Sequence, residues 1–292
     1  MIWINVIVQG VLLGAVYALF ACGLSLMFGV MRIINLAHGD IAVVGAYLVW
    51  TVADHAGVSP FVALAAVVPG MLVFGYALYA LLLGRSLRGG SLVPLLTTFG
   101  LAIVIENSLQ QLFSSDVRSL GAAAGRITTA SWRINDALAI PWFGALTLAV
   151  AILVLGGLDL FLRRTGPGRE MRATAQDPDA ARLVGIDARA VYARATAIAV
   201  ATAALAGAFQ AVRSVFEPNS GPTQLIFAFE AVVIGGFGSL WGTLLGGIVL
   251  GVAQAIGGHL GPQYAILAGH LVFLVVLASP RGRMLAARST WT

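Results

Sequence analysis

The stretch IWINVIVQGVLLGAVYALFACGLSLMFGVM, residues 2–31, contains no ionisable side chain other than Tyr17 and Cys22. Residues 61–84 resemble it, with tyrosine as their only ionisable residue type. A helix that crosses a membrane needs about 20 consecutive, mainly apolar residues. Both stretches exceed that length, so the sequence predicts an all-α fold: a polytopic transmembrane helix bundle that forms a single domain over residues 1–292.

The composition supports a membrane protein. Hydrophobic residues make up 59% of the 292 residues and charged residues only 10%, whereas roughly a quarter of the residues in a soluble domain are charged. The first apolar run has no basic region before it and is too long for the core of a signal peptide, so we expect it to be retained as a span. Cys22 is the only cysteine, which excludes disulfides and cysteine metal clusters.

The pattern of apolar residues predicts about eight or nine membrane segments along the chain, with ends defined to within a few residues. Nine candidates are 3–30, 41–53, 60–84, 92–113, 138–162, 190–212, 225–238, 240–258 and 263–279. Two of them, 41–53 and 225–238, are shorter than a usual span and are flanked by glycine and polar residues. Such segments in both halves of a transporter indicate broken helices that line a pathway; strongly tilted ordinary helices are the alternative.

The arginines predict the orientation, because cytoplasmic loops carry an excess of basic residues. All 17 basic residues are arginine. Thirteen would lie in the cytoplasm and four outside, the four being Arg118, Arg126, Arg133 and Arg213. This distribution places the N-terminus outside and the C-terminus in the cytoplasm, which nine crossings satisfy.

The absence of lysine limits the chemistry. A nucleotide-binding P-loop needs a lysine on the phosphates, and this chain has none. We therefore expect no cofactor here, with any ATP and Mg²⁺ bound by separate chains. The net charge of +5 does not indicate nucleic-acid binding, since arginine in membrane proteins usually sets topology.

One polar segment, 163–190, interrupts the apolar chain and predicts a short helix with defined ends. Asp177 is a candidate N-cap, Pro178 suits the first helical position, and Asp179 complements the positive end of the helix dipole. Gly185 provides the stop, and Asp187 can cap the next span. We expect the glycine–proline–glycine stretch 166–168 to end the preceding helix.

A helix of barely two turns is marginal in water, so it needs a surface to rest on. Ala180 and Ala181 permit close approach, and Leu183 and Val184 offer an apolar edge. A solvated loop is the alternative, but the double capping favours a docking element. The predicted docking residues are Asp177, Pro178, Asp179, Ala180, Ala181, Arg182, Leu183 and Gly185.

The pattern Asp179-Ala180-Ala181-x-x-x-Gly185 resembles the EAA loop of bacterial ABC importer permeases, a cytoplasmic helix that fits a groove on the ATPase. GLSLMFGVMRIINLAHGDIAVVGAY, residues 23–47, resembles the H-type permease of branched-chain amino acid ABC importers more specifically. Residues 169–187 and 231–252 are also similar to that family, in the right order. The glycine-rich SLGHA variant of the sister M-type permease is not matched.

The resemblance implies an inner-membrane assembly with a second permease, two ATP-binding subunits and a periplasmic substrate-binding protein. It implies import of branched-chain amino acids or a related small amide, with no catalysis in this chain. A permease for urea or a sugar is the alternative of the same class. An intramembrane enzyme or channel using His38, Asp40 and Glu106 is the alternative from another class.

Most of the candidate pathway or gate residues lie in or beside the two short segments, and Glu106 lies in the middle of the segment 92–113. The candidates are Asn35, His38, Gly39, Asp40, Glu106, Glu230, Gly235, Gly236 and Gly238. Asp40 could cap a helix or form part of a gate. Glu106 and Glu230, which depart from the family pattern, could meet a substrate ammonium group or hold helices together, since intramembrane carboxylates usually face the bundle interior. No nucleophile or metal partner accompanies them, so we expect neither catalysis nor a metal site.

Overall fold

The computed structural model describes residues 2–90, 92–135 and 138–279. It is a helix bundle in which six helices are long and apolar enough to cross a membrane. They are α1 (Ile2–Met31), the continuous helical stretch Pro60–Gly89, α5 (Leu92–Phe113), α7 (Trp142–Arg164), α10 (Ala188–Arg213) and α12 (Leu240–Leu260). The stretch Pro60–Gly89 consists of α3 (Pro60–Leu78), a π-helical turn (Tyr79–Leu83), α4 (Gly84–Ser86) and a 3-10 turn (Leu87–Gly89).

Each of the nine predicted segments falls on a helix. The remaining three are α2 (His38–Ala56), α11 (Gly221–Gly235) and α13 (Tyr264–Ala278), with 19, 15 and 15 residues. They are not among the six that satisfy the length and hydropathy of a span. The predicted all-α polytopic bundle is therefore confirmed.

Two local predictions are wrong. Residues 138–141 form a strand, β2 (Leu138–Pro141), paired antiparallel with β1 (Ser131–Asn135), so α7 begins later than predicted. The single turn α6 (Arg126–Thr129) precedes this hairpin. The glycine–proline–glycine stretch begins a new helix, α8 (Gly166–Gln176), because the Thr165 hydroxyl accepts a hydrogen bond from the Gly168 N–H and caps it.

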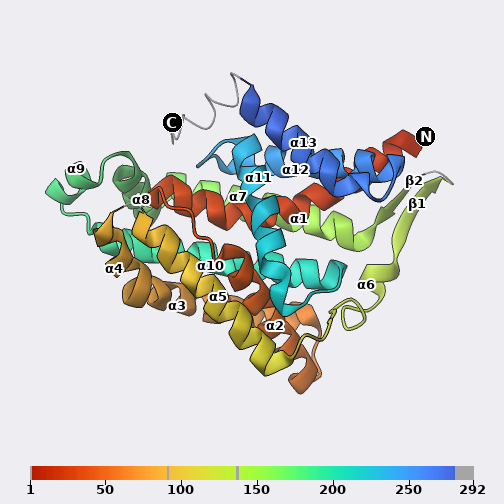
Figure 1. Ribbon diagram of the computed structural model, residues 1–292, viewed down its shortest axis with the longest axis horizontal. Coiled ribbons are helices and arrows are strands. Elements are labelled where there is room, and N and C mark those ends of the chain that lie inside the picture. Colours follow the sequence, from red (N-terminus) through yellow and green to blue (C-terminus); the bar gives the residue numbers. More distant parts are fainter. Residues whose placement is uncertain (1, 91, 136–137, 280–292) are drawn as a thin grey trace.

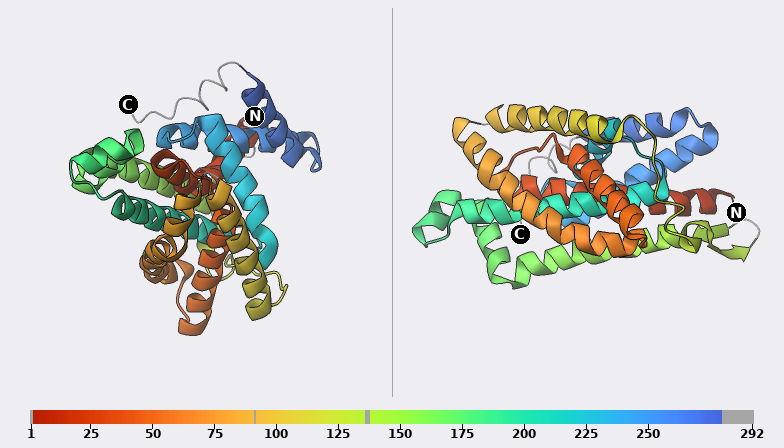
Figure 2. Two further views of the ribbon diagram at one scale, coloured as in Figure 1. Left: turned by 60° about the vertical axis from the view of Figure 1, so that its left-hand side comes forward. Right: turned by 90° about the horizontal axis from the view of Figure 1, so that it is seen from below.

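Most of the long helices run roughly along the longest axis of the molecule, with α1 near the centre, whereas α5 runs obliquely to that axis (Figures 1 and 2). α1 and α12 pack at backbone distance, since a Cβ on Gly14 would lie 2.4 Å from the Gly247 carbonyl oxygen. Small residues allow this approach where lipid supplies no hydrophobic drive between helices.

The same succession of elements occurs twice. α1 is followed by a non-helical return (residues 32–37), then α2 and α3; α10 is followed by a return containing a 3-10 turn (Pro218–Ser220), then α11 and α12. α1 packs on α12 and α11, whereas α10 packs on α3 and α2. α1 and α10 run antiparallel, because Thr196 near the start of α10 meets Met31 at the end of α1. Inverted repeats of this kind place binding sites at the repeat interface in transporters.

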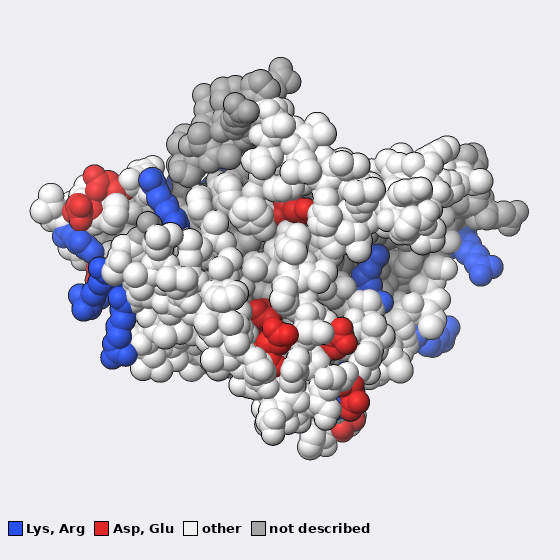
Figure 3. Space-filling model, in the orientation of Figure 1, with Lys and Arg blue, Asp and Glu red and all other residues white. Residues whose placement is uncertain are grey.

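In the view of Figure 3 the basic side chains lie mainly toward the two ends of the long axis, whereas acidic side chains also lie in the middle and at the lower edge. The end that carries the short helix α9 (Pro178–Leu183) has more arginines than the end that carries the β-hairpin. Three further arginines of the predicted cytoplasmic set, Arg281, Arg283 and Arg288, lie outside the described residues.

Candidate functional site

The predicted short helix is present as α9, at one extreme of the molecule (Figure 1). The Asp177 carboxylate accepts hydrogen bonds from the N–H groups of Asp179 at 2.9 Å and Ala180 at 3.0 Å. Pro178 occupies the first turn, where its missing donor costs nothing. The sequence therefore specified this N-terminus correctly.

The end of α9 is equally defined. Gly185 adopts φ +85°, a left-handed conformation that glycine reaches without strain. The Asp187 carboxylate then accepts from the Arg189 N–H at 2.9 Å and caps α10. These two residues turn the chain sharply from α9 into the bundle.

The side chains of α9 divide into an inner and an outer face. Ala181 is 4% exposed and packs inward, whereas Leu183 and Val184 are 89% and 77% exposed. Two adjacent large apolar side chains in solvent at the tip of the molecule form an apolar edge without a partner among the described residues. Such a contiguous apolar edge is a feature of interaction surfaces.

α8 connects this edge to the bundle. Met171 of α8 is fully buried, and α8 packs against both α1 and α10. A small cavity of about 190 Å³ at this junction is lined by residues of both helices, including Met31 and Tyr192, together with Thr174 and Pro178. A displacement of α9 would therefore reach the end of α1.

We expect Asp177→Ala to loosen α9 by about 1 kcal/mol, the usual loss when an N-cap side chain is removed. Hydrogen exchange at the N–H groups of Asp179 and Ala180 should accelerate accordingly, while exchange in α10 stays unchanged. Asp177→Asn is the matched control, since asparagine caps equally well. Equal exchange rates in the alanine variant and the wild type would contradict the cap.

The second predicted cluster lies deep in the bundle. His38, the first residue of α2, donates from Nε2 to the carbonyl oxygen of Phe20 at 2.9 Å. Phe20 lies 11 residues before the end of α1 at Met31, which corresponds to about 16 Å along a helix. The return segment 32–37 thus runs back beside α1, and α2 begins in the interior of the molecule.

α11 begins at the same place. A Cβ on Gly39 would lie 2.0 Å from the Gly221 carbonyl oxygen, and a Cβ on Gly221 would lie 1.9 Å from Asp40 Oδ1. From this junction α2 and α11 leave in opposite directions, both steep to the long axis (Figure 1). Two helix N-termini, each with a partial positive charge, therefore face one another around Asp40.

Several buried polar groups at this junction lack partners. Asp40 is 2% exposed and His38 is fully buried, yet Asp40 Oδ1 and His38 Nδ1 make no hydrogen bond within the described residues. Asn35 is satisfied locally, its Oδ1 accepting from the Ala37 N–H at 3.0 Å. Buried polar atoms without partners are uncommon in native proteins, so these two atoms make the junction a candidate site.

The two predicted intramembrane glutamates differ in their surroundings. Glu106 on α5 is half-buried. Glu230 on α11 is 3% exposed and pairs with His270 of α13. The second arrangement fits the structural alternative for Glu230, a carboxyl group that links two helices.

The three predicted glycines end α11. Gly236 and Gly238 have φ values of +91° and +77°. Gly235 meets α12 closely, since a Cβ there would lie 2.1 Å from the Gly242 carbonyl oxygen. They form the tight turn from α11 into α12, at a distance from the Asp40 junction.

Sequence reasoning missed three residues of this region. Gly221 forms the other half of the helix junction, His270 is the partner of Glu230, and the Thr98 hydroxyl accepts from the Leu36 N–H at 3.2 Å. Gly221 had a signal, because the stretch NSGPTQ before the second short helix parallels LAHGD before the first. Thr98 had none, since only the fold brings α5 to the return segment.

Within the described ranges 2–90, 92–135 and 138–279, no three His, Cys, Asp or Glu residues group so that they could hold a metal ion. What the geometry provides is an exposed apolar edge at one end, connected through α8 and α1 to a polar helix junction in the interior.

Residues 6–279 match the family model described as branched-chain amino acid transport system / permease component. The chain is 33% identical to the high-affinity branched-chain amino acid transport system permease protein BraD of Pseudomonas aeruginosa, over 96% of this chain and 95% of that protein. It is 29% identical to LivH of Escherichia coli K12, over 94% of this chain and 92% of that protein. It is 25% identical to LivM of the same organism, over 91% of this chain and 67% of that protein.

Proposed function

The chain belongs to the family of branched-chain amino acid transport permeases, and from that premise we propose that it is the H-type membrane subunit of an ATP-driven importer. Its cargo is a branched-chain amino acid or a related small amide. The observation that carries the proposal is α9: a helix capped at both ends whose Leu183 and Val184 project into solvent. It is the element through which separate ATPase chains, with their ATP and Mg²⁺, drive this subunit.

The proposed mechanism is conformational. Closure of the ATPases displaces α9 and α8, which rest on the end of α1 and the start of α10. Because the segment 32–37 joins the end of α1 directly to the buried start of α2, the displacement reaches the junction of Gly39, Asp40 and Gly221. That junction opens and closes the pathway by separating the two helix N-termini.

The proposed topology has nine crossings, with the N-terminus outside and the C-terminus in the cytoplasm. Ten of the fourteen arginines in the described residues belong to segments at the α9 end, and four belong to segments at the hairpin end. The excess of basic residues on the cytoplasmic side supports placing α9 inside the cell. There it would be accessible to ATPase subunits.

The proposed partners also include a second permease subunit and a periplasmic binding protein. Similarity to both LivH and LivM, two permease proteins of one organism, supports a pair of related permeases. Leu96, Phe99 and Val104 on α5 are all more than half exposed. They could face lipid or a second permease.

Uptake into proteoliposomes tests the function. The purified complex of both permeases and both ATPases is reconstituted with ATP inside and the binding protein with labelled leucine outside. We expect leucine to accumulate only when ATP and the binding protein are both present. Equilibration of leucine through this chain alone would establish a channel, and accumulation of urea or ribose in place of leucine would overturn the cargo.

Leu183→Glu tests the docking edge. A carboxylate at the centre of an apolar contact loses its hydration, so we expect the amount of ATPase that co-purifies with this chain to fall about tenfold or more. Val117→Glu is the matched control, because Val117 is also well exposed, at 59%, near the opposite end of the bundle. Full retention of ATPase by Leu183→Glu would show that α9 is not the docking element.

A further inference from the structure

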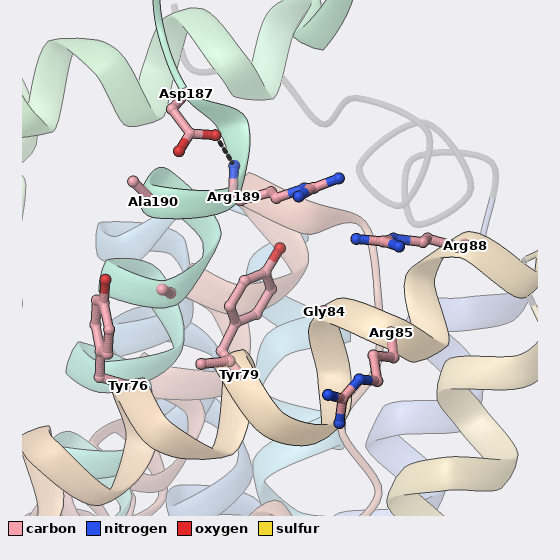
Figure 4. A pocket seen from close by; sticks show the side chains of 10 residues that line it. Tyr76, Tyr79, Gly84, Arg85, Arg88, Asp187, Arg189 and Ala190 are labelled. Carbon is pink, nitrogen blue, oxygen red and sulfur yellow. Dashed lines mark hydrogen bonds between the residues drawn. The ribbon is translucent and has the colours of Figure 1, made fainter.

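A cavity of about 380 Å³ lies at the α9 end of the bundle, between the continuation of α3 and the start of α10 (Figure 4). Its polar lining consists of Tyr76, Tyr79, Arg85, Arg88, Asp187 and Arg189. The Arg88 and Arg189 guanidinium groups extend toward one another across the opening, and the Tyr79 hydroxyl points toward Arg189 (Figure 4).

The cavity carries unbalanced positive charge. Arg163, Arg182 and Arg194 each pair with a carboxylate, at 2.9, 3.1 and 2.7 Å. Arg88 and Arg189 make no ion pair within the described residues, and Arg85 donates only to the Leu81 carbonyl oxygen, at 2.8 Å. The single acid, Asp187, already caps the Arg189 N–H.

The π-helical turn Tyr79–Leu83 places these residues on one side of the helix. The lining positions 76, 80, 84 and 88 are spaced by four, a spacing that drifts around a regular α-helix of 3.6 residues per turn. The wider π turn offsets that drift. Such turns inside α-helices are frequent at functional sites.

An apolar groove adjoins the cavity on its membrane side. It measures about 430 Å³, and Tyr76 lines both spaces. The groove residues Leu72 and Val73 precede the cavity residues on α3, and Ala197 and Ile198 follow them on α10, so the groove lies farther from the α9 end. The one arginine in the groove, Arg194, is neutralised by Glu170.

We propose that the cavity and groove together bind an anionic phospholipid, with the phosphate between Arg88 and Arg189 and an acyl chain in the groove. Arginine forks match phosphate oxygens, and basic pockets between membrane helices bind anionic headgroups. A phospholipid has a charged headgroup followed by apolar acyl chains. Along this pair of helices the charged cavity is followed by Tyr76 and then by the apolar groove, so the site has the same order of polarity. An acidic surface of an ATPase could contact the arginines but would leave the groove unfilled, which favours the lipid.

Native mass spectrometry tests the proposal. The complete transporter is equilibrated in bilayers of equal phosphatidylglycerol and phosphatidylcholine, extracted gently, and its retained lipids are counted. Each arginine near a membrane surface raises the affinity for anionic lipid about fivefold. We therefore expect the preference for phosphatidylglycerol to fall about 25-fold in Arg88→Gln/Arg189→Gln and to survive in Arg88→Lys/Arg189→Lys. Arg163→Gln, at the same end but paired with Asp159, is the matched control.

Val73→Trp tests the groove, since Val73 is 71% exposed and its replacement leaves the core intact. We expect it to reduce retained phosphatidylglycerol, and we expect excess inorganic phosphate not to displace the lipid. Displacement by phosphate would reduce the site to one for a free anion and overturn the lipid assignment. An unchanged lipid preference in the glutamine variant, with loss of ATPase instead, would overturn it in favour of a protein contact.

Discussion

Gly185→Val should abolish coupled uptake while ATP hydrolysis continues and the protein remains in the membrane. Gly185 holds φ +85°, a conformation that costs other residues about 1–3 kcal/mol and β-branched residues most. A helix of six residues has few interactions with which to absorb this strain, so α9 would be displaced from the bundle. We expect uptake in proteoliposomes to fall about tenfold or more.

Two control variants separate strain from bulk. No atom lies within 4 Å of a Cβ on Gly185 or on Gly157 of α7, and only Gly185 has positive φ. Gly157→Val should therefore leave uptake near normal. Gly185→Asn should retain much of it, because asparagine tolerates the left-handed region. Normal uptake by Gly185→Val would refute the coupling role of α9.

Gly39→Ala should have a comparably large effect through the interior junction. The added methyl group would lie 2.0 Å from the Gly221 carbonyl oxygen, so α2 and α11 would have to separate. Overpacking of a tight contact costs about 1–3 kcal/mol, occasionally more. We expect a lower melting temperature and a loss of uptake of about tenfold or more, measured on the same reconstituted complex.

Gly70→Ala in α3 is the matched control for this substitution, since nothing lies within 4 Å of a Cβ there. It should stabilise the helix slightly, because alanine is a better helix former than glycine by about 1 kcal/mol. A Gly39→Ala variant that transports and melts like wild type would show that the close approach of α2 and α11 is not required.

The elements that could be predicted from the sequence were those with local causes. The apolar runs predicted nine segments that the structure shows as helical, and the capping residues Asp177, Pro178 and Gly185 predicted α9. α8 was missed because the stretch 166–168 reads equally as the end of one helix and the start of another. Only the Thr165 cap distinguishes the two.

The interior junction depended on long-range packing and could be predicted only in part. Glycine and polar residues beside two short segments indicated broken helices, and the structure has non-helical returns before both α2 and α11. That these helices meet at Gly39 and Gly221, 182 positions apart, follows from the antiparallel packing of α1 and α10. The ion pair of Glu230 could not be predicted from the sequence for the same reason, because its partner His270 lies on another helix.

Cross-linking from α9 tests the central claim most directly. In Leu183→Cys the new thiol is on an exposed side chain, and the native Cys22 is fully buried and does not compete. A short thiol-to-amine cross-linker added to the assembled complex should join this chain to an ATPase subunit, with a yield that changes when ATP is bound. Reaction of the introduced thiol only with reagents applied from outside the cell, or no cross-link to an ATPase in any nucleotide state, would contradict the account.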